Sequence, residues 1–179
     1  ITISRASRQA DFPAKFQLIA AMNPCPCGYQ GDPSGRCHCT EEQVARYRAK
    51  ISGPLLDRID MHLEVPRVSL EVLRKGSAEG EESSRDIRTR VVAARELAIT
   101  RCGKVNAALT AVEVKQYCPL SEQGHKILEQ AMDQFGLSHR AYHRILKLAR
   151  TIADLAHSEQ IEIPHLSEAI AYRKLDRIK

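Results

Sequence analysis

The second half of this chain carries a helical pattern almost without interruption, and this pattern restricts the fold more than any other feature of the sequence. It is clearest within residues 138–157, where apolar residues recur every three or four positions and so share one helix face. These residues are Ile145, Leu148, Ala149, Ile152 and either Leu155 or Ala156. Such a face must be buried against other helices, so the pattern predicts a small helical bundle.

Five helices are predicted in this half from apolar spacing and from capping residues. Their ranges are 85–101, 110–117, 121–135, 138–157 and 164–173. Ser121 and Ser138 stand at N-cap positions, where a hydroxyl oxygen can accept hydrogen bonds from the first free amides of a helix. Gly136 is placed to end one helix, and Pro164 fits the first turn of another.

The first half is patterned differently, with short apolar stretches separated by turns. Residues 1–4 alternate apolar and polar side chains as a half-buried strand does, and residues 9–12 are predicted to form a turn. The run FQLIAAM at 16–22 is typical of a strand buried on both faces of a parallel sheet. With a further short strand at 62–65, this half is predicted to be α/β.

Two shorter helices and a linker complete the predicted organisation. Thr40 and Gln43 have the spacing of a capping box, which would open a helix that runs to about Ile51 and is broken by Ser-Gly-Pro at 52–54. A short helix is predicted at 69–74, and the stretch after it is small, acidic and polar, as linkers are. The predicted domains are an α/β part at 1–76, a linker at 77–84 and a helical domain at 85–179.

The charge of the chain is mildly basic. A net charge of +5 and an isoelectric point near 9.0 permit a polyanionic partner without requiring one. Aromatic residues make up only 4% and tryptophan is absent, which argues against a stacking surface for single strands, so nucleic-acid contacts are expected to be mainly to phosphates. No apolar run approaches the roughly 18 residues that cross a bilayer, and we expect a cytoplasmic protein without a membrane partner.

Four cysteines lie close together in a loop at 25–39 that is rich in glycine and proline. Zinc binds four thiolates tetrahedrally, and two close pairs can supply them, although the single residue inside each pair is a shorter spacing than usual. We expect a structural zinc here, with His38 as a substitute for one thiolate and reduced free thiols as the alternative. The isolated Cys102 and Cys118 are expected to be ordinary small apolar residues. The expected ligands are Cys25, Cys27, Cys37 and Cys39.

Four motifs, taken in order along the chain, resemble one known family. They are FQLIAAMNPCPCGY from residue 16, CHCT from residue 37, YRAKISGPLLDRIDMHLEVP from residue 47 and LSHRAYHRILKLARTIADL from residue 137. Together they resemble the magnesium-chelatase-like AAA+ ATPases of the ComM/YifB competence type. The resemblance implies the C-terminal part of an AAA+ α/β core, with a pre-sensor-1 β-hairpin near 1–15 and a sensor-1 strand before the Cys loop, followed by a helical-bundle lid.

Two catalytic roles are implied by the resemblance. Asn23 matches the sensor-1 position, where an amide could orient the water that attacks the γ-phosphate of ATP; the alternative is a turn-forming asparagine before a proline. Arg58 matches the arginine finger that is presented to the ATP of a neighbouring subunit, where its charge would stabilise the transferred phosphoryl group. The alternative for Arg58 is an ordinary ion pair with Asp57 or Asp60.

A nucleotide-binding role is implied for a third position. Arg140 matches sensor 2 at the start of a lid helix, where an arginine can reach the phosphates and couple the lid to the nucleotide state. Arg144 lies one turn later on the same face and is the second candidate. For both, the alternative is a solvated helix surface.

The phosphate-binding loop of such ATPases is absent from this sequence. No G-x-x-x-x-G-K-[ST] occurs, and no acidic strand end for magnesium follows one. We expect both, and with them the main sites for ATP and Mg²⁺, in a segment upstream. The chain alone is therefore expected to be inactive.

Candidate DNA-binding residues come from the same resemblance. Hairpins of this type project into the central channel of the ring, which points to Arg5, Arg8 and Lys15. The alternative is a basic ridge on the helix at 85–101, where Arg85, Arg88 and Arg95 share a face and Arg90, Arg101 and the nearby Lys104 add further charge, but such a ridge is more often simply solvated.

Three functions are compatible with these features. The first is a hexameric, helicase-like DNA motor that promotes branch migration of single-stranded or branched DNA during natural transformation and recombination. The second is a magnesium-chelatase-type ATPase that remodels a partner enzyme. The third is a non-enzymatic zinc-binding interaction module, which would leave Arg58 and Arg140 without a purpose.

Overall fold

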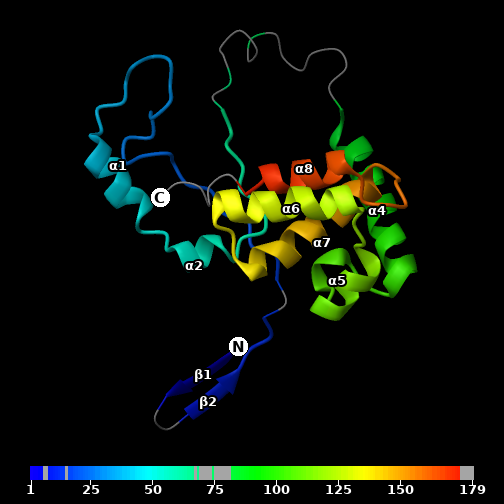
Figure 1. Ribbon diagram of the computed structural model, residues 1–179. Coiled ribbons are helices and arrows are strands. Elements are labelled where there is room, and N and C mark those ends of the chain that lie inside the picture. The colour runs from blue at the N-terminus through cyan, green and yellow to red at the C-terminus, as the bar shows by residue number, and fades with distance from the viewer. Residues whose placement is uncertain (6–7, 15, 67, 69–73, 75–81, 174–179) are drawn as a thin grey trace. The chain divides into compact units, whose positions relative to one another are not determined.

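The computed structural model describes residues 1–5, 8–14, 16–66, 68, 74 and 82–173 (Figure 1). The chain divides into two compact units, Ile1–Lys50 and Ile51–Lys179, which are described separately. The described part is mostly helical, with one two-stranded sheet. The predicted domain boundary near residue 76 stays a prediction.

The first unit begins with an exposed β-hairpin. Strand β1 (Thr2–Arg5) pairs antiparallel with β2 (Arg8–Asp11), in a register that sets Thr2 opposite Asp11 and Arg5 opposite Arg8. The predicted strand at the start is confirmed, but it is not half-buried, because all four residues of β1 are exposed. The turn predicted at 9–12 is wrong, because Asp11 lies in the ladder and accepts a hydrogen bond of 2.5 Å from the Thr2 hydroxyl.

The apolar run FQLIAAM does not form the predicted buried strand. Residues 16–22 have no regular secondary structure, and the exposed fraction reaches 72% at Phe16 and 86% at Ile19. A buried strand needs hydrogen-bonded neighbours on both edges, and the described residues contain no strand besides β1 and β2. The prediction failed because it depended on pairing with strands that the described residues lack.

Helix α1 (Glu41–Arg48) closes the first unit, as predicted. The Thr40 hydroxyl accepts a hydrogen bond from the Gln43 amide, and the Gln43 side chain accepts one from the Thr40 amide, so the capping box is formed. Arg48 donates to the carbonyl of Pro24 at 3.3 Å and to the side chain of Gln30 at 3.0 Å. These bonds attach the helix to the Cys loop.

The second unit opens with a short helix, α2 (Gly53–Leu56), which Ser52 caps. The strand predicted at 62–65 is wrong. The amide of His62 donates instead to the carbonyl of Tyr172 at 2.8 Å, so this segment is held by a distant helix end rather than by a ladder. The predicted helix at 69–74 and linker at 77–84 lie largely outside the described residues, and Ser84 is the first residue of α4.

The helical bundle contains all five predicted helices and one added turn. The hydroxyls of Ser121 and Ser138 cap their helices, and Gly136 ends one with a φ of 59°. Pro164 lies in the first turn of the last helix. The elements are α4 (Ser84–Cys102), η1 (Asn106–Ala108), α5 (Ala111–Tyr117), α6 (Glu122–Phe135), α7 (His139–Leu155) and α8 (Ile163–Ala171).

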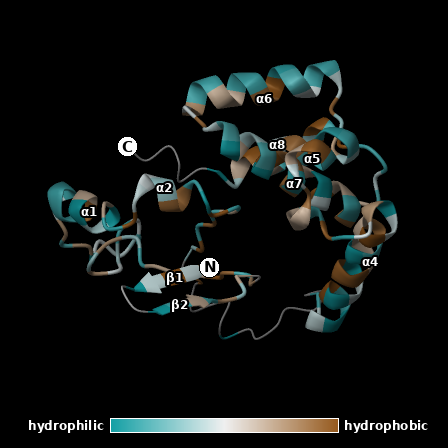
Figure 2. Cartoon of the chain, turned by 90° about the horizontal axis from the view of Figure 1, so that it is seen from below, coloured by the Kyte–Doolittle hydropathy of each residue, from teal (hydrophilic) through white to brown (hydrophobic). Residues whose placement is uncertain are grey.

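Helix α7 is the centre of the bundle, and it contacts α4, η1, α5 and α8. The predicted stripe faces the core, with Ile145 and Ala149 buried, Leu148 and Ile152 packed against them, and Ala156 exposed beyond the helix end. Figure 2 shows apolar residues in brown where α5, α7 and α8 meet. Among the described residues, no helix has the length and apolar character needed to cross a membrane.

A buried ion pair lies inside this core, and the sequence pattern did not reveal it. Arg150 and Asp154, one turn apart on α7, are each only 1% exposed. The Arg150 guanidinium also donates to the carbonyls of Ser158 at 2.5 Å and Glu159 at 2.8 Å. Asp154 accepts further hydrogen bonds from Arg101 and Asn106, so both buried charges are satisfied.

Candidate functional site

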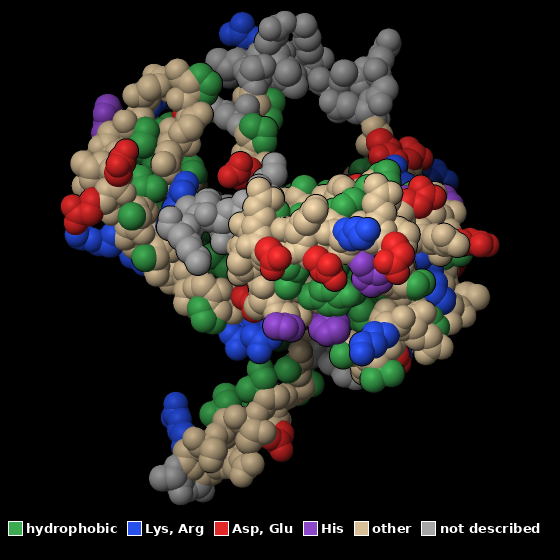
Figure 3. Space-filling view, in the orientation of Figure 1, with side chains coloured by type: hydrophobic (Ala, Val, Ile, Leu, Met, Phe, Trp, Pro, Cys, Tyr) green, Lys and Arg blue, Asp and Glu red, His purple; other side chains and the backbone are tan. Residues whose placement is uncertain are grey.

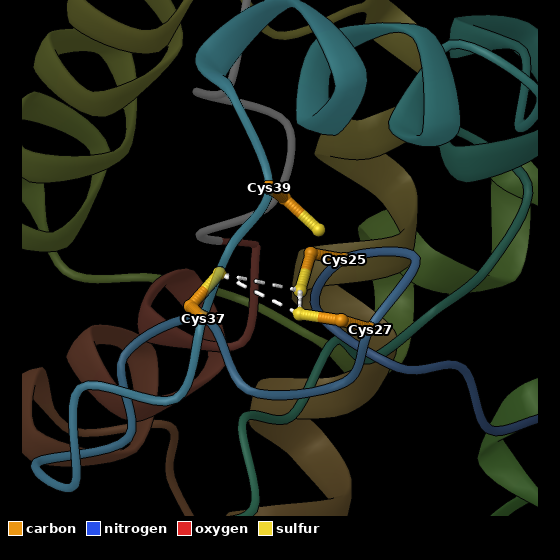
Figure 4. Close-up of side chains that lie close together, drawn as sticks. All are labelled: Cys25, Cys27, Cys37 and Cys39. Carbon is orange, nitrogen blue, oxygen red and sulfur yellow. Dashed lines mark hydrogen bonds between the residues drawn. The ribbon is translucent and has the colours of Figure 1, made fainter.

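The four cysteines of the loop at 25–39 meet at one point, and we call them the cysteine cluster (Figure 4). The Sγ atom of Cys25 lies 3.3 Å from that of Cys27 and 3.8 Å from that of Cys37. Cys27 and Cys37 are 3.7 Å apart, and all four sulfur atoms lie within 4.8 Å of one another. The structure therefore brings together the four ligands expected from the spacing.

These distances match the requirements of a tetrahedral metal centre. With zinc–sulfur bonds of about 2.3 Å, the sulfur atoms of a tetrahedral site are about 3.8 Å apart. Cys25 is buried and the other three are half-buried, whereas His38 is exposed and does not belong to the group. The cluster can hold a metal ion, with the cysteines as its complete set of ligands.

The electrostatics of the cluster also favour a cation. A hydrogen bond from the Tyr29 amide, helped by the Cys25 thiol, lowers the pKa of Cys27 to about 6. A hydrogen bond from the Cys27 amide lowers the pKa of Cys39. The Cys27 side chain, burial and the charge of Cys25 have the opposite effect, which is larger, and they raise the pKa of Cys39 to about 12. Ionisation of one cysteine thus opposes ionisation of the next, and a divalent cation would relieve that repulsion.

Asn23 lies against the first turn of the Cys loop. The amide of Gly28 donates to the carbonyl of Cys25 at 3.0 Å, which closes this turn, and Gly28 has a φ of 81° that favours glycine. A Cβ atom at position 28 would lie 3.6 Å from the Asn23 side chain. Asn23 is exposed and its side chain lies beside the turn that follows Cys25, while its sensor-1 role stays a prediction.

Arg58 is an exposed arginine directly after α2. Its guanidinium donates to the carbonyl of Pro54 at 2.9 Å, within the same turn. Among the described residues, no carboxylate forms an ion pair with it, and the neighbouring Asp57 and Asp60 are engaged elsewhere. The side chain is therefore available to an anion from outside the chain.

The aspartates on either side of Arg58 pair with the two sensor-2 candidates. Arg140 lies 3.6 Å from the Asp57 carboxylate, which also accepts a hydrogen bond of 2.7 Å from Ser138. Arg144 pairs with Asp60. Both arginines belong to the first two turns of α7, so the start of this helix and the LLDRID motif lie together. Arg58, Arg140 and Arg144, with Asp57 and Asp60, form what we call the arginine group.

A fourth arginine beside this group was missed by the sequence analysis. Arg173, just beyond α8, is 1% exposed, donates to the carbonyl of Ile59 and lies 3.6 Å from Asp57. No pattern in the sequence distinguishes it, because an arginine after a helix end is usually solvated. It is found only through contacts with residues more than a hundred positions away.

The predicted DNA-binding arginines lie opposite each other on the hairpin. Arg5 and Arg8 are exposed, and Figure 3 shows basic side-chain atoms projecting from the hairpin into solvent. Lys15 lies outside the described residues. On α4, the alternative ridge keeps Arg88 and Arg95 exposed, but Arg90 is paired with Glu82. DNA binding by the hairpin or by the ridge on α4 stays a prediction.

Comparison with known proteins places the chain in one group. A family model described as "Magnesium chelatase, subunit ChlI C-terminal" matches residues 81–173, and one described as "Magnesium chelatase, subunit ChlI" matches residues 1–73. The chain is 44% identical to Competence protein ComM of Haemophilus influenzae over 99% of its length and 34% of that protein. It is 45% identical to YifB of Salmonella typhimurium and of Escherichia coli, again over 99% of its length and 35% of theirs. The chain thus spans about a third of the length of these relatives.

Proposed function

Because the chain belongs to the magnesium-chelatase-like family, with ComM and YifB among its relatives, we propose that it forms the C-terminal portion of an AAA+ ATPase that moves on DNA. The observation that carries this proposal is the gathering of Arg58, Arg140 and Arg144 around the LLDRID motif. Three arginines that contact one short segment, with Arg58 and Arg140 exposed and Arg144 half-buried, offer guanidinium groups of the kind that bind phosphate oxygens.

The roles of these arginines follow from their contacts. Within the described part of the chain Arg58 has no carboxylate partner, so its charge can stabilise the phosphoryl group that a neighbouring subunit transfers to water. Arg140 and Arg144 form ion pairs with aspartates, Asp57 and Asp60 respectively. When nucleotide is present, its phosphate oxygens would compete with these carboxylates. Asn23 would orient the attacking water. ATP and its Mg²⁺ would be held mainly by residues upstream of this chain.

DNA is proposed as the substrate of the motor because a close relative is a competence protein, and competence is the uptake of DNA. In a hexameric ring, the hairpin carrying Arg5, Arg8 and Lys15 would face the central channel and contact DNA phosphates. Movement on single-stranded or branched DNA would then promote branch migration during transformation. The second candidate, an ATPase that remodels a partner enzyme for magnesium insertion, is favoured by the family description alone.

DNA-stimulated hydrolysis tests the proposed function. We expect ATP hydrolysis by the full-length protein to rise when single-stranded or branched DNA is added. The double variant Arg5→Glu/Arg8→Glu should lose this stimulation while keeping basal hydrolysis, because it reverses the charge that meets the phosphates. Its DNA affinity should also depend less steeply on salt concentration.

The alternatives give different results in the same assay. Hydrolysis that is indifferent to DNA would favour the chelatase-type ATPase, and no hydrolysis at all would favour a zinc-binding interaction module. If the double variant keeps both the wild-type DNA affinity and its salt dependence, the hairpin is not the DNA-binding element. A variant of the alternative ridge, Arg88→Glu/Arg95→Glu, serves as the matched control on α4.

We further propose that the metal of the cysteine cluster is zinc and that its role is structural. Four cysteine ligands leave no open position for water or substrate, which excludes the arrangement of a catalytic zinc site. The ion would join the turn at Cys25 to the segment just before α1. It would thereby order a loop that has no regular secondary structure of its own.

Metal analysis tests this site directly. The protein purified without added metal is expected to contain about one zinc per chain, as structural four-cysteine sites do. Cys25→Ser should remove most of it, because Cys25 is the buried ligand. Cys102→Ser is the matched control, since Cys102 is isolated on α4, and its zinc content should equal that of the wild type. Equal metal in all three proteins, or none in the wild type, would leave reduced free thiols as the correct description.

A further inference from the structure

The segment that carries Arg58 is fastened to the end of the lid at three points. The guanidinium of Arg173 donates to the carbonyl of Ile59 and lies 3.6 Å from the carboxylate of Asp57. The amide of His62 donates to the carbonyl of Tyr172 at 2.8 Å. Two consecutive residues after α8 therefore hold the chain on both sides of Arg58, at Asp57 before it and at Ile59 and His62 after it.

We propose that Arg173 is a positioning residue for Arg58. It contacts the residue before Arg58 through a charge and the residue after it through a backbone hydrogen bond, so it fixes the backbone from which the Arg58 side chain projects. This inference rests on the proposed role of Arg58 as an arginine finger. In this proposal Arg173, which follows α8, supports the function of Arg58, which lies more than a hundred residues earlier in the sequence.

The burial of Arg173 explains why it can act in this way. The side chain is 1% exposed, whereas Arg58 is exposed. A guanidinium is planar and presents several donors in fixed directions, so it can hold a carbonyl and a carboxylate at the same time. A lysine at this position would carry the charge but could not reproduce both contacts with the same geometry.

The arrangement also explains why Arg58 forms no ion pair with a carboxylate of the described residues. Asp57 is engaged by Ser138, Arg140 and Arg173, and Asp60 is engaged by Arg144. Both acidic neighbours of Arg58 are thus directed to lid residues. Among the residues that the structure describes, the partner of Arg58 is the Pro54 carbonyl, which is uncharged and which a phosphate oxygen can displace.

An arginine finger depends on accurate placement. Displacement of a catalytic group by about 1 Å can cost on the order of a hundredfold in rate. We expect Arg173→Lys in the full-length protein to lower kcat for ATP hydrolysis by about ten- to a hundredfold with little change in KM for ATP, because the finger acts on the transition state. Arg150→Lys is the matched control: Arg150 is equally buried in the same bundle but does not contact residues 57–62. At a temperature where both variants are folded, Arg150→Lys should keep its kcat.

Two further measurements separate positioning from a general structural role. In a background that already carries Arg58→Ala, Arg173→Lys should cause no further loss, because the residue through which it acts is gone. Hydrogen exchange should speed up at the amides of 57–62 in Arg173→Lys, and not in Arg150→Lys.

The outcomes distinguish this inference from the proposed function. If Arg58→Ala lowers hydrolysis while Arg173→Lys leaves kcat unchanged, or lowers it equally in both backgrounds, Arg173 does not position the finger. If Arg58→Ala leaves hydrolysis unchanged, the finger assignment itself fails and the positioning role fails with it. Unchanged exchange at 57–62 in Arg173→Lys would overturn the proposed fastening independently of any activity.

Discussion

Replacing Arg58 with alanine in the full-length protein is expected to lower kcat for ATP hydrolysis by about a thousandfold or more, the range found when arginine fingers are absent from GTPases. The reason is local. Arg58 is exposed, it has no carboxylate partner among the described residues, and its two acidic neighbours pair with arginines of α7. Its charge is therefore available to a phosphoryl group, and alanine removes that charge without breaking an ion pair of the fold.

The measurement requires an unchanged oligomer, because a finger acts on the nucleotide of a neighbouring subunit. Size-exclusion chromatography with light scattering should give the same mass for Arg58→Ala and for the wild type. Arg46→Ala is a suitable control, since Arg46 is also an exposed arginine and its ion pair among the described residues is with the exposed Glu42. Hydrolysis at the wild-type rate in an intact Arg58→Ala oligomer would show that this arginine is not the finger.

The second large effect is expected on stability. Arg150→Met should lower the free energy of unfolding by about 3–5 kcal/mol, as removal of one member of a buried ion pair does. The variant leaves Asp154 charged and buried, and it removes the donors that satisfy the carbonyls of Ser158 and Glu159. Urea denaturation followed by circular dichroism measures the loss.

A matched variant separates burial from charge. Arg90 forms a two-point ion pair with Glu82 on the exposed side of α4, and Arg90→Met should cost less than about 1 kcal/mol because exposed pairs are weak. Equal losses for Arg150→Met and Arg90→Met would mean that the buried network does not stabilise the bundle.

The helical part of the fold could be predicted because its signals are local. Ser121 and Ser138 need only the amides three residues ahead, and Gly136 needs only its own backbone freedom. The cysteine cluster was predictable for the same reason, since its ligands lie within one short loop. In each case the residues that decide the structure are neighbours in sequence.

The predictions that failed concern features whose deciding residues are far apart in sequence. The strands predicted at 16–22 and 62–65 require partners elsewhere, and strand propensity alone does not supply them. The sequence also offered Asp57 and Asp60 as partners of Arg58, whereas the structure pairs them with Arg140 and Arg144 on α7. Arg173 was missed because its partners lie across the bundle. These features depend on contacts between segments that are distant in sequence, and local sequence patterns do not reveal such contacts.

The exposed FQLIAAM segment has a practical consequence for work with this chain in isolation. A mostly apolar stretch without charge, with Phe16 and Ile19 exposed to water, has the composition that favours intermolecular β-structure with other chains. Solutions of the isolated chain will therefore tend to aggregate as concentration rises. Denaturation curves for variants such as Arg150→Met must be shown to be independent of protein concentration before they are read as folding equilibria.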